Sequence, residues 1–274
     1  MQKEKSFEKY KKVADYILNI IGEEIDTAII LGTGLGTLLD KMEDKIEINY
    51  KDIPGFLVST VMSHPGKFIV EKLKDKKIIC MAGRFHYYEG YDYSELATPV
   101  YVLKLLGVKT LILTNAAGAV NYNFHPGDIC VVTDHLNFAA VSPQRGNNLS
   151  EFGERFYPID NLYDRDLRKV AKEAALEIGI DLKEGVYFYT VGPHFETPAE
   201  IRAIRTLGGD LVGMSTITES LTAGHCGIKV LCLSLATNYS SDRVENMDGS
   251  EIDEVAEEAS YNFRNLIIKI LEKI

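Results

Sequence analysis

A carboxylate and an amide in the last third of the chain are the side chains best suited to chemistry. Glu196 follows a Gly-Pro pair in residues 192–202 (GPHFETPAEIR), and Asn238 ends the apolar run LCLSLATN. At neighbouring strand ends, such side chains can hydrogen-bond two edges of one planar heterocycle. Between them, residues 212–216 (VGMST) are small enough to expose backbone. Metal, nucleotide-cofactor and nucleophile motifs that would compete for the reaction centre are absent from the sequence.

A second segment, residues 83–91 (GRFHYYEGY), carries groups that bind an anion. In an extended chain Arg84, His86 and Tyr88 alternate onto one face. The arginine fork matches phosphate, the imidazole adds a donor, and the tyrosine ring can pack on a sugar. A solvated edge strand is the competing interpretation, which the density of unusual residues disfavours.

Three short turns carry weaker signals. Residues 32–36 (GTGLG) could let backbone N–H groups approach an anion, but they lack the third glycine of a dinucleotide fingerprint. Residues 114–119 (TNAAGA) could let a ligand lie against bare backbone at a strand end. Ligand-free turns explain both segments equally well. His64, in SHPG, is by itself more typical of a structural or solvated loop histidine.

Alternating strand-like and helical patterns predict an α/β fold. Buried strands are predicted at residues 27–31, 77–81, 110–114, 129–132 and 230–236. Their near-continuous apolarity indicates a sheet covered on both faces. Residues 7–21 have helical periodicity. No repeat or linker divides the chain, so residues 1–274 are expected to form one domain.

The C-terminal segment predicts a long amphipathic helix that Ser250 caps. Its apolar stripe consists of Val255, Ala259, Phe263, Leu266, Ile267, Ile270 and Leu271. The preceding polar residues 240–249 are predicted to be a loop, and their position after Asn238 suggests a mobile lid.

Composition excludes several classes of function. The net charge is −10 without a basic stripe, which argues against nucleic-acid binding. Neither a bilayer-spanning run nor a signal peptide is evident, so we expect a cytoplasmic protein without a membrane partner. The four cysteines lack zinc-type spacing, so we expect buried thiols in a reducing compartment and no metal site.

Taken together, these segments resemble the trimeric, low-molecular-mass purine nucleoside phosphorylases. The resemblance rests on LGTGLG, SHPG, GRFHYYEGY, TNAAGA, DHLNF, GPHFETPAEIR, VGMST and SLATN, in family order and spacing. It implies one domain with a central mixed, largely buried, distorted barrel-like sheet flanked by helices. It also implies a homotrimer that cleaves inosine, guanosine and their deoxy forms reversibly, giving free base and α-(deoxy)ribose 1-phosphate. Inorganic phosphate would be a co-substrate, with no cofactor or metal.

The resemblance also assigns site residues. The positions that match phosphate-site residues are Thr33, His64, Arg84, His86, Asn115, Ala116 and Ser215. Those that match ribose contacts are Tyr88, Met214 and Phe152, the last reaching in from a neighbouring protomer. Those that match the purine site are Ala117, Gly118, Phe195, Glu196, Val212, Thr237 and Asn238. Asn238, Glu196 and His86 are the expected catalytic residues.

The chemistry of the base site predicts a preference among purines. Glu196 would accept from N1–H of a 6-oxopurine, and Asn238 would stabilise N7 of the departing base. Adenine presents an acceptor at N1, and a mismatched buried polar partner costs about 1–3 kcal/mol. Hypoxanthine and guanine are therefore favoured over adenine.

The chain departs from the family pattern at Tyr239, which replaces a commonly basic residue after the Thr-Asn pair. A second departure keeps alternatives open. Ile252 stands where the family often has a histidine that contacts the 5′-hydroxyl, so a 5′-methylthioinosine phosphorylase is the nearest alternative. Glu196 and Asn238 argue against the methylthioadenosine form, whose base site typically uses Ser and Asp. A non-catalytic purine sensor is a further alternative, which the full set of site residues disfavours. A nicotinamide oxidoreductase would rest on LGTGLG alone.

Overall fold

The computed structural model describes residues 5–32, 45–61, 65–73, 76–139, 142–246 and 250–274. Within these residues the strands are β1 (Thr27–Leu31), β2 (Ile46–Asn49), β3 (Lys67–Leu73), β4 (Lys76–Ala82), β5 (Thr110–Ala119), β6 (Ile129–Asn137), β7 (Lys183–Tyr189), β8 (Leu211–Gly213) and β9 (Lys229–Tyr239). The α-helices are α1 (Phe7–Ile21), α2 (Tyr93–Leu96), α3 (Thr98–Leu105), α4 (Arg165–Glu177), α5 (Pro198–Thr206), α6 (Ile217–His225) and α7 (Ser250–Lys273). Two short 3₁₀ helices are η2 (Tyr50–Asp52) and η3 (Tyr87–Glu89).

All of these strands belong to one mixed sheet, in the order β2-β3-β4-β1-β5-β8-β7-β6-β9. Strand β9 also pairs in parallel with β5, so the strands from β5 to β9 close into a barrel, and β1 to β4 extend from it. This arrangement confirms the α/β fold and the distorted, barrel-like sheet. All five predicted buried strands are present, and several are longer than predicted.

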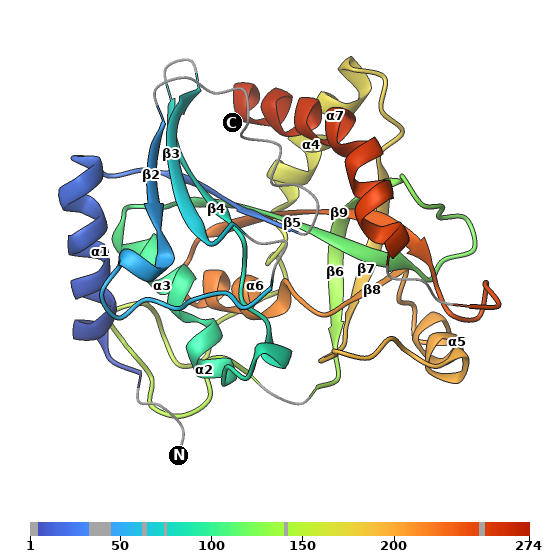
Figure 1. The fold of residues 1–274 in the computed structure, drawn as a ribbon, viewed down its shortest axis with the longest axis horizontal. Helices are drawn as coiled ribbons and strands as arrows, with labels where there is room; N and C mark the ends of the chain where they lie inside the picture. The colour runs from blue at the N-terminus through green and yellow to red at the C-terminus, as the bar shows by residue number, and fades with distance from the viewer. Residues whose placement is uncertain (1–4, 33–44, 62–64, 74–75, 140–141, 247–249) are drawn as a thin grey trace.

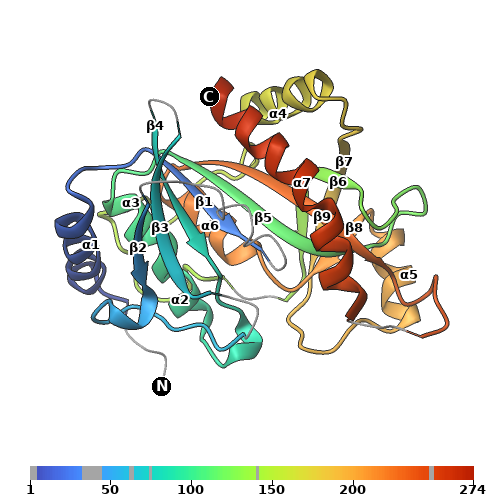
Figure 2. The ribbon, with the colours of Figure 1, turned by 45° about the horizontal axis from the view of Figure 1, so that its top comes forward.

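Helices cover both faces of the sheet because its strands are apolar on both sides (Figure 1). Ile30 of β1 packs in a core cluster with residues of α1, α3 and α6, whereas the adjacent Ile29 packs in a second cluster with residues of α4 and α7. Figure 2 shows α7 lying across the sheet beside α4. The period-two alternation of a strand thus anchors two helical layers on one sheet.

The C-terminal helix α7 buries the predicted apolar stripe from Ala259 to Leu271, while Val255 is half-buried. Ser250 is its first residue, and the conformation of the Ser250 side chain lies outside what the structure describes. None of the helices that the described ranges contain is long and apolar enough to cross a membrane.

Strand β9 carries a bulge at the point where it reaches the functional residues. Its register with β5 runs evenly to the pair Ala117–Ala236 and then shifts, so that Gly118 pairs with Asn238. Thr237 is therefore the extra residue on β9. Because a bulge re-aims the side chains that follow it, this irregularity sets the direction of Asn238.

Candidate active site

One cavity of about 370 Å³ lies where the carboxyl ends of β5 and β9 meet η3 and the β8–α6 connection. Its volume is within the range of small-molecule sites. The cavity is lined by Arg84, His86, Tyr88, Ala116, Ala117, Gly118, Pro193, Phe195, Glu196, Val212, Gly213, Met214, Ser215, Thr237, Asn238, Ser240, Ser241 and Ile252. It therefore brings together most of the residues that the sequence assigned to phosphate, ribose and purine.

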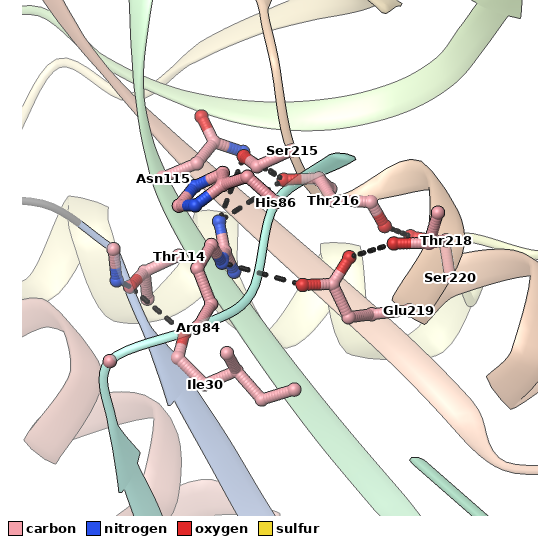
Figure 3. Close-up of polar contacts among 12 residues, drawn as sticks. Ile30, Arg84, His86, Thr114, Asn115, Ser215, Thr216, Thr218, Glu219 and Ser220 are labelled. Atoms are coloured by element: carbon pink, nitrogen blue, oxygen red, sulfur yellow. Dashed lines mark hydrogen bonds and ion pairs between the residues drawn. The ribbon is translucent and has the colours of Figure 1, made fainter. Parts of the chain in front are cut away.

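Arg84 supplies a buried positive charge to this cavity. Its side chain follows β4 and is 2% exposed. Nη1 donates a hydrogen bond of 2.9 Å to Ser215 Oγ, and Nε lies 3.4 Å from Glu219 Oε1 (Figure 3). A guanidinium fixed at a cavity wall is a strong partner for phosphate oxygens.

His86 is held by a carboxylate three residues further along the chain. Its Nδ1 lies 2.9 Å from Glu89 Oε1, and its ring stacks on Tyr88 with the centroids 4.6 Å apart. Burial raises the pKa of Glu89, but hydrogen bonds from His86 and Thr60 outweigh this effect and lower it to about 2. Glu89 is therefore ionised at neutral pH and orients the imidazole through Nδ1.

Arg84, His86 and Tyr88 would alternate onto one face in an extended chain, but the segment is not extended throughout. Residues 87–89 form η3, and His86 supplies its N-terminal cap in a capping box with Glu89. This capping box turns the chain, so the condition of an extended segment is not met. All three predicted side chains still line the cavity.

The β8–α6 connection turns sharply at Thr216. This residue has φ 78° and ψ −42°, and Ile217 N donates to Ser215 O at 2.9 Å, which makes a γ-turn. Such a conformation is strained for a β-branched residue and costs on the order of 1–3 kcal/mol. Side chains hold it, since Asn115 Nδ2 donates to Thr216 Oγ1 at 2.9 Å and Ser220 Oγ donates to Thr216 O at 2.8 Å.

Asn115 therefore acts one layer behind the cavity. Its side chain is buried between Thr216 and Cys232, and Asn115 is not among the lining residues, whereas Ala116 is. This position differs from the direct phosphate contact that the sequence predicted. The amide supports the turn that presents Ser215.

Glu196 and Asn238 are the carboxylate and the amide that the resemblance assigned to the purine site. Glu196 Oε1 accepts a hydrogen bond of 2.7 Å from Thr190 Oγ1, and its backbone carbonyl accepts one of 2.7 Å from Ser241 Oγ. Asn238 Oδ1 accepts from Thr237 Oγ1 at 3.0 Å, and Nδ2 donates to Tyr239 O at 3.0 Å. Both side chains line the cavity, so a carboxylate and an amide face one ligand space.

Two glycines make room for side chains that line the cavity. A Cβ on Gly118 would lie 3.2 Å from Val212 Cγ1 and 3.4 Å from Asn238 Nδ2. Gly192, with φ 64°, comes so close to Met214 that a Cβ would lie 2.3 Å from its Sδ. The same Cβ would lie 3.2 Å from Tyr88 Cδ1, so two of the three predicted ribose contacts pack on Gly192.

The loop after β9 begins as an anchored segment. Asp242 forms two hydrogen bonds to Arg205 of α5, at 2.6 and 3.0 Å, and Arg243 Nη1 donates to Phe124 O at 2.9 Å. Ser241 binds the carbonyl of Glu196. These contacts argue against a mobile lid at residues 240–243. They also connect the loop to the purine residues.

The position of Phe152 contradicts the prediction that it reaches into a neighbouring protomer. It is 6% exposed and packs against Phe7, Tyr10 and Tyr101 of its own chain, so it cannot reach a neighbouring protomer. Phe156, four residues later in the same segment, is 88% exposed. Phe152 precedes Gly153 and Phe156 follows it in SEFGERFYP, and only the packing of the two side chains distinguishes them.

Two other predicted residues, Thr33 and His64, lie outside the described residues. Sequence reasoning missed Glu89, Thr216, Glu219 and Ser241. The spacing of Glu89 from His86 could have revealed the first, and the acid within the mostly small and apolar ITESLTAGH segment could have revealed Glu219. No group of three or more His, Cys, Asp or Glu residues in the described ranges could hold a metal ion.

Comparisons with known proteins agree with this geometry. Residues 26–272 match the model of the phosphorylase superfamily. The chain is 40% identical to purine nucleoside phosphorylase 1 of Bacillus subtilis, over 96% of this chain and 98% of that protein. It is 41% identical to the purine nucleoside phosphorylase of Bos taurus, over 92% and 89% of the two chains.

A solved structure of Schistosoma mansoni purine nucleoside phosphorylase in complex with inosine superposes with a TM-score of 0.92. The two chains are 40% identical, and the match covers 97% of this chain and 96% of the other. The match covers nearly the whole chain and therefore includes the sequence motifs, the barrel and the cavity. The chain belongs to the phosphorylase superfamily, as one of its purine nucleoside phosphorylases.

Proposed function

We propose that the protein catalyses the reversible phosphorolysis of 6-oxopurine ribonucleosides and deoxyribonucleosides, with inosine and guanosine as substrates. One observation carries this proposal: a single cavity contains both the Arg84–Ser215 pair with His86 and the Glu196–Asn238 pair. The first group suits a phosphate dianion, and the second suits a heterocycle that offers both a donor and an acceptor.

In the proposed reaction a phosphate oxygen forms a bond to C1′ of the sugar while the C1′–N9 bond breaks. The electron pair of the broken bond moves onto the purine. Arg84, His86 and Ser215 hold the phosphate, whose negative charge stabilises the positive charge that develops on the sugar. Catalysis is then mainly positioning and electrostatic stabilisation, so inorganic phosphate is the co-substrate and no metal or cofactor is required.

On the purine, Asn238 Nδ2 donates to N7, where negative charge develops, and Glu196 accepts from N1–H. The hydrogen bond from Thr237 orients the amide, because it occupies Oδ1 and directs Nδ2 toward donor roles. Adenosine offers an unprotonated N1 to Glu196, and the unpaired carboxylate costs about 1–3 kcal/mol, or roughly 5- to 150-fold.

The proposed assembly is a homotrimer with a shared active site. Because Phe152 is buried, we assign the aromatic that enters a neighbouring site to Phe156. Its 88% exposure is unusual for a large apolar side chain and is explained if a second copy covers it.

A second candidate substrate class is favoured by one residue. Ile252, at the start of α7, lines the cavity and offers no hydrogen-bonding group to a 5′-hydroxyl. A 5′-deoxy or 5′-methylthio nucleoside would bury an apolar group there without leaving a polar group unpaired. 5′-Methylthioinosine combines this feature with the 6-oxopurine that Glu196 requires.

The test is a comparison of initial rates with inosine, guanosine, adenosine and 5′-methylthioinosine at saturating phosphate. We expect inosine and guanosine to be cleaved at least several-fold faster than adenosine. A preference for 5′-methylthioinosine would transfer the assignment to the second candidate. Tight nucleoside binding without turnover of any substrate would instead identify a purine sensor.

A further inference from the structure

Behind the phosphate-facing side of the cavity, helix α6 carries a carboxylate that the proposed chemistry does not use. Glu219 is 4% exposed and is not among the cavity-lining residues. Its Oε1 lies 3.4 Å from Arg84 Nε, and its Oε2 accepts a hydrogen bond of 2.9 Å from Thr218 Oγ1 (Figure 3). Glu219 therefore touches the arginine but not the ligand space.

The surroundings of this pair are apolar. A small space beside Arg84 and Glu219 is walled by Ile30, Met81, Phe85, Leu96 and Pro99. A carboxylate in such surroundings is stable only when paired, so Glu219 depends on the guanidinium and on the Thr218 hydroxyl. Thr218 thus fixes one oxygen of the carboxylate and leaves the other toward Arg84.

The guanidinium is consequently held at two separate corners. Nε faces Glu219, and Nη1 donates to Ser215 Oγ at 2.9 Å. Because the group is planar, an ion pair at one corner and a hydrogen bond at another restrict the direction of the whole fork. The arginine can then receive phosphate without first losing rotamer freedom.

Charge alone would argue against a carboxylate at this position. A negative charge beside Arg84 weakens the attraction for a phosphate dianion. Its presence is explained if the gain in orientation exceeds that loss, since a misplaced phosphate reacts slowly even when bound.

We propose that Glu219, held by Thr218, is a positioning residue that aligns Arg84 for the attacking phosphate. This inference rests on the proposed phosphorolysis for its kinetic consequence, whereas its effect on phosphate binding can be measured separately. Glu219 itself would not contact phosphate or nucleoside.

The test compares Glu219→Gln, Thr218→Val and Thr218→Ser with the wild type. We measure kcat and the KM values for phosphate and inosine, together with direct binding of inorganic phosphate by calorimetry. For Glu219→Gln we expect the KM for phosphate to rise about 10-fold or more, with the KM for inosine changed less than about 2-fold. Thr218→Val should shift the phosphate KM in the same direction but less, and Thr218→Ser, which keeps the hydroxyl, should behave as wild type.

Glu71→Gln is the matched control, because Glu71 is also a buried glutamate, 3% exposed, but lies on β3 opposite Ile78 of β4. Its phosphate KM should be unchanged. A lower phosphate KM in Glu219→Gln would show that the carboxylate acts only as an opposing charge. Equal increases for phosphate and inosine would show a general structural role. Either result overturns the proposal.

If Glu219→Gln does not fold, the Thr218→Val and Thr218→Ser pair decides by the same criteria. If the wild type binds phosphate but cleaves no nucleoside, the proposed function fails while calorimetry still tests Glu219. In that case, phosphate affinity unchanged across all variants would refute the positioning role.

Discussion

Replacing Asn238 by alanine removes an amide that lines the cavity. In the structure Thr237 Oγ1 donates a hydrogen bond to Asn238 Oδ1, and Asn238 Nδ2 donates one to Tyr239 O, both at 3.0 Å. In the proposed reaction the second hydrogen of Nδ2 is the one offered to N7. Asn238→Ala removes that donor, whereas Thr237→Val leaves it in place but releases its orientation.

The two changes should differ in size. Loss of a donor aimed at developing negative charge costs about 10²–10³ in kcat. Loss of one neutral hydrogen bond that only orients the amide costs about 0.5–1.5 kcal/mol, or roughly 2- to 13-fold. Asn238→Asp should be at least as damaging as the alanine variant, because it places a negative charge where the purine becomes negative.

The assay is initial-rate release of hypoxanthine from inosine at saturating phosphate, with thermal unfolding as the control for folding. If Asn238→Ala and Thr237→Val lower kcat equally in folded proteins, both substitutions act through the bulge of β9. Near-normal kcat in Asn238→Ala would refute a role for the amide at N7.

Three further predictions test separate parts of the structure. Phe152→Ala should destabilise the fold by about 3–5 kcal/mol, because Phe152 is buried. Phe156→Ala should cost little stability, because Phe156 is exposed, but should raise the KM for nucleoside. Chemical denaturation and kinetics of both variants check this, and the reverse pattern would restore the original assignment of Phe152. Ile252→His should raise kcat/KM for inosine by up to about tenfold and lower it for 5′-methylthioinosine, because a donor then meets the 5′-hydroxyl; unchanged ratios would place the 5′ group elsewhere. Burial raises the pKa of Glu71 from 4.5 to about 7, so its contribution to stability is present below pH 4.5 and is lost as the pH rises through about 7. Between pH 4.5 and pH 8, the free energy of unfolding of the wild type should therefore fall by about 3 kcal/mol relative to that of Glu71→Gln. Urea unfolding measures this difference, and parallel pH profiles of the two proteins would contradict it.

The sequence predicted the elements whose physical cause is local. TAIIL, in which four apolar residues follow Thr27, becomes the fully buried strand β1, and the spacing of Phe263, Ile267 and Ile270 predicts the buried face of α7. The residues at the ends of β5 and β9 line one cavity, because the carboxyl ends of parallel strands lie at one edge of a sheet.

What the sequence could not predict depends on contacts between distant segments. The γ-turn at Thr216 is held by Asn115, about a hundred residues earlier in the chain, and the bulge at Thr237 exists only in the pairing of β9 with β5. Phe152 and Phe156 look equivalent in SEFGERFYP, and only packing against Tyr10 and Tyr101 distinguishes them.

Tyr239 illustrates how a departure from the family pattern is accommodated. The resemblance leads one to expect a basic residue after the Thr-Asn pair. Here the Arg243 guanidinium lies 4.2 Å from the centre of the Tyr239 ring, and His125 Nδ1 lies 2.9 Å from its hydroxyl. A cation therefore lies against the Tyr239 ring, supplied by a residue four positions later.

The most direct test of the proposed reaction is the release of hypoxanthine from inosine with and without inorganic phosphate, with the sugar product identified by phosphorus NMR. If one cavity holds phosphate on Arg84, His86 and Ser215 and the base on Glu196 and Asn238, release requires phosphate and yields one ribose 1-phosphate for each hypoxanthine. Release at the same rate without phosphate, with free ribose as the product, would contradict the proposal.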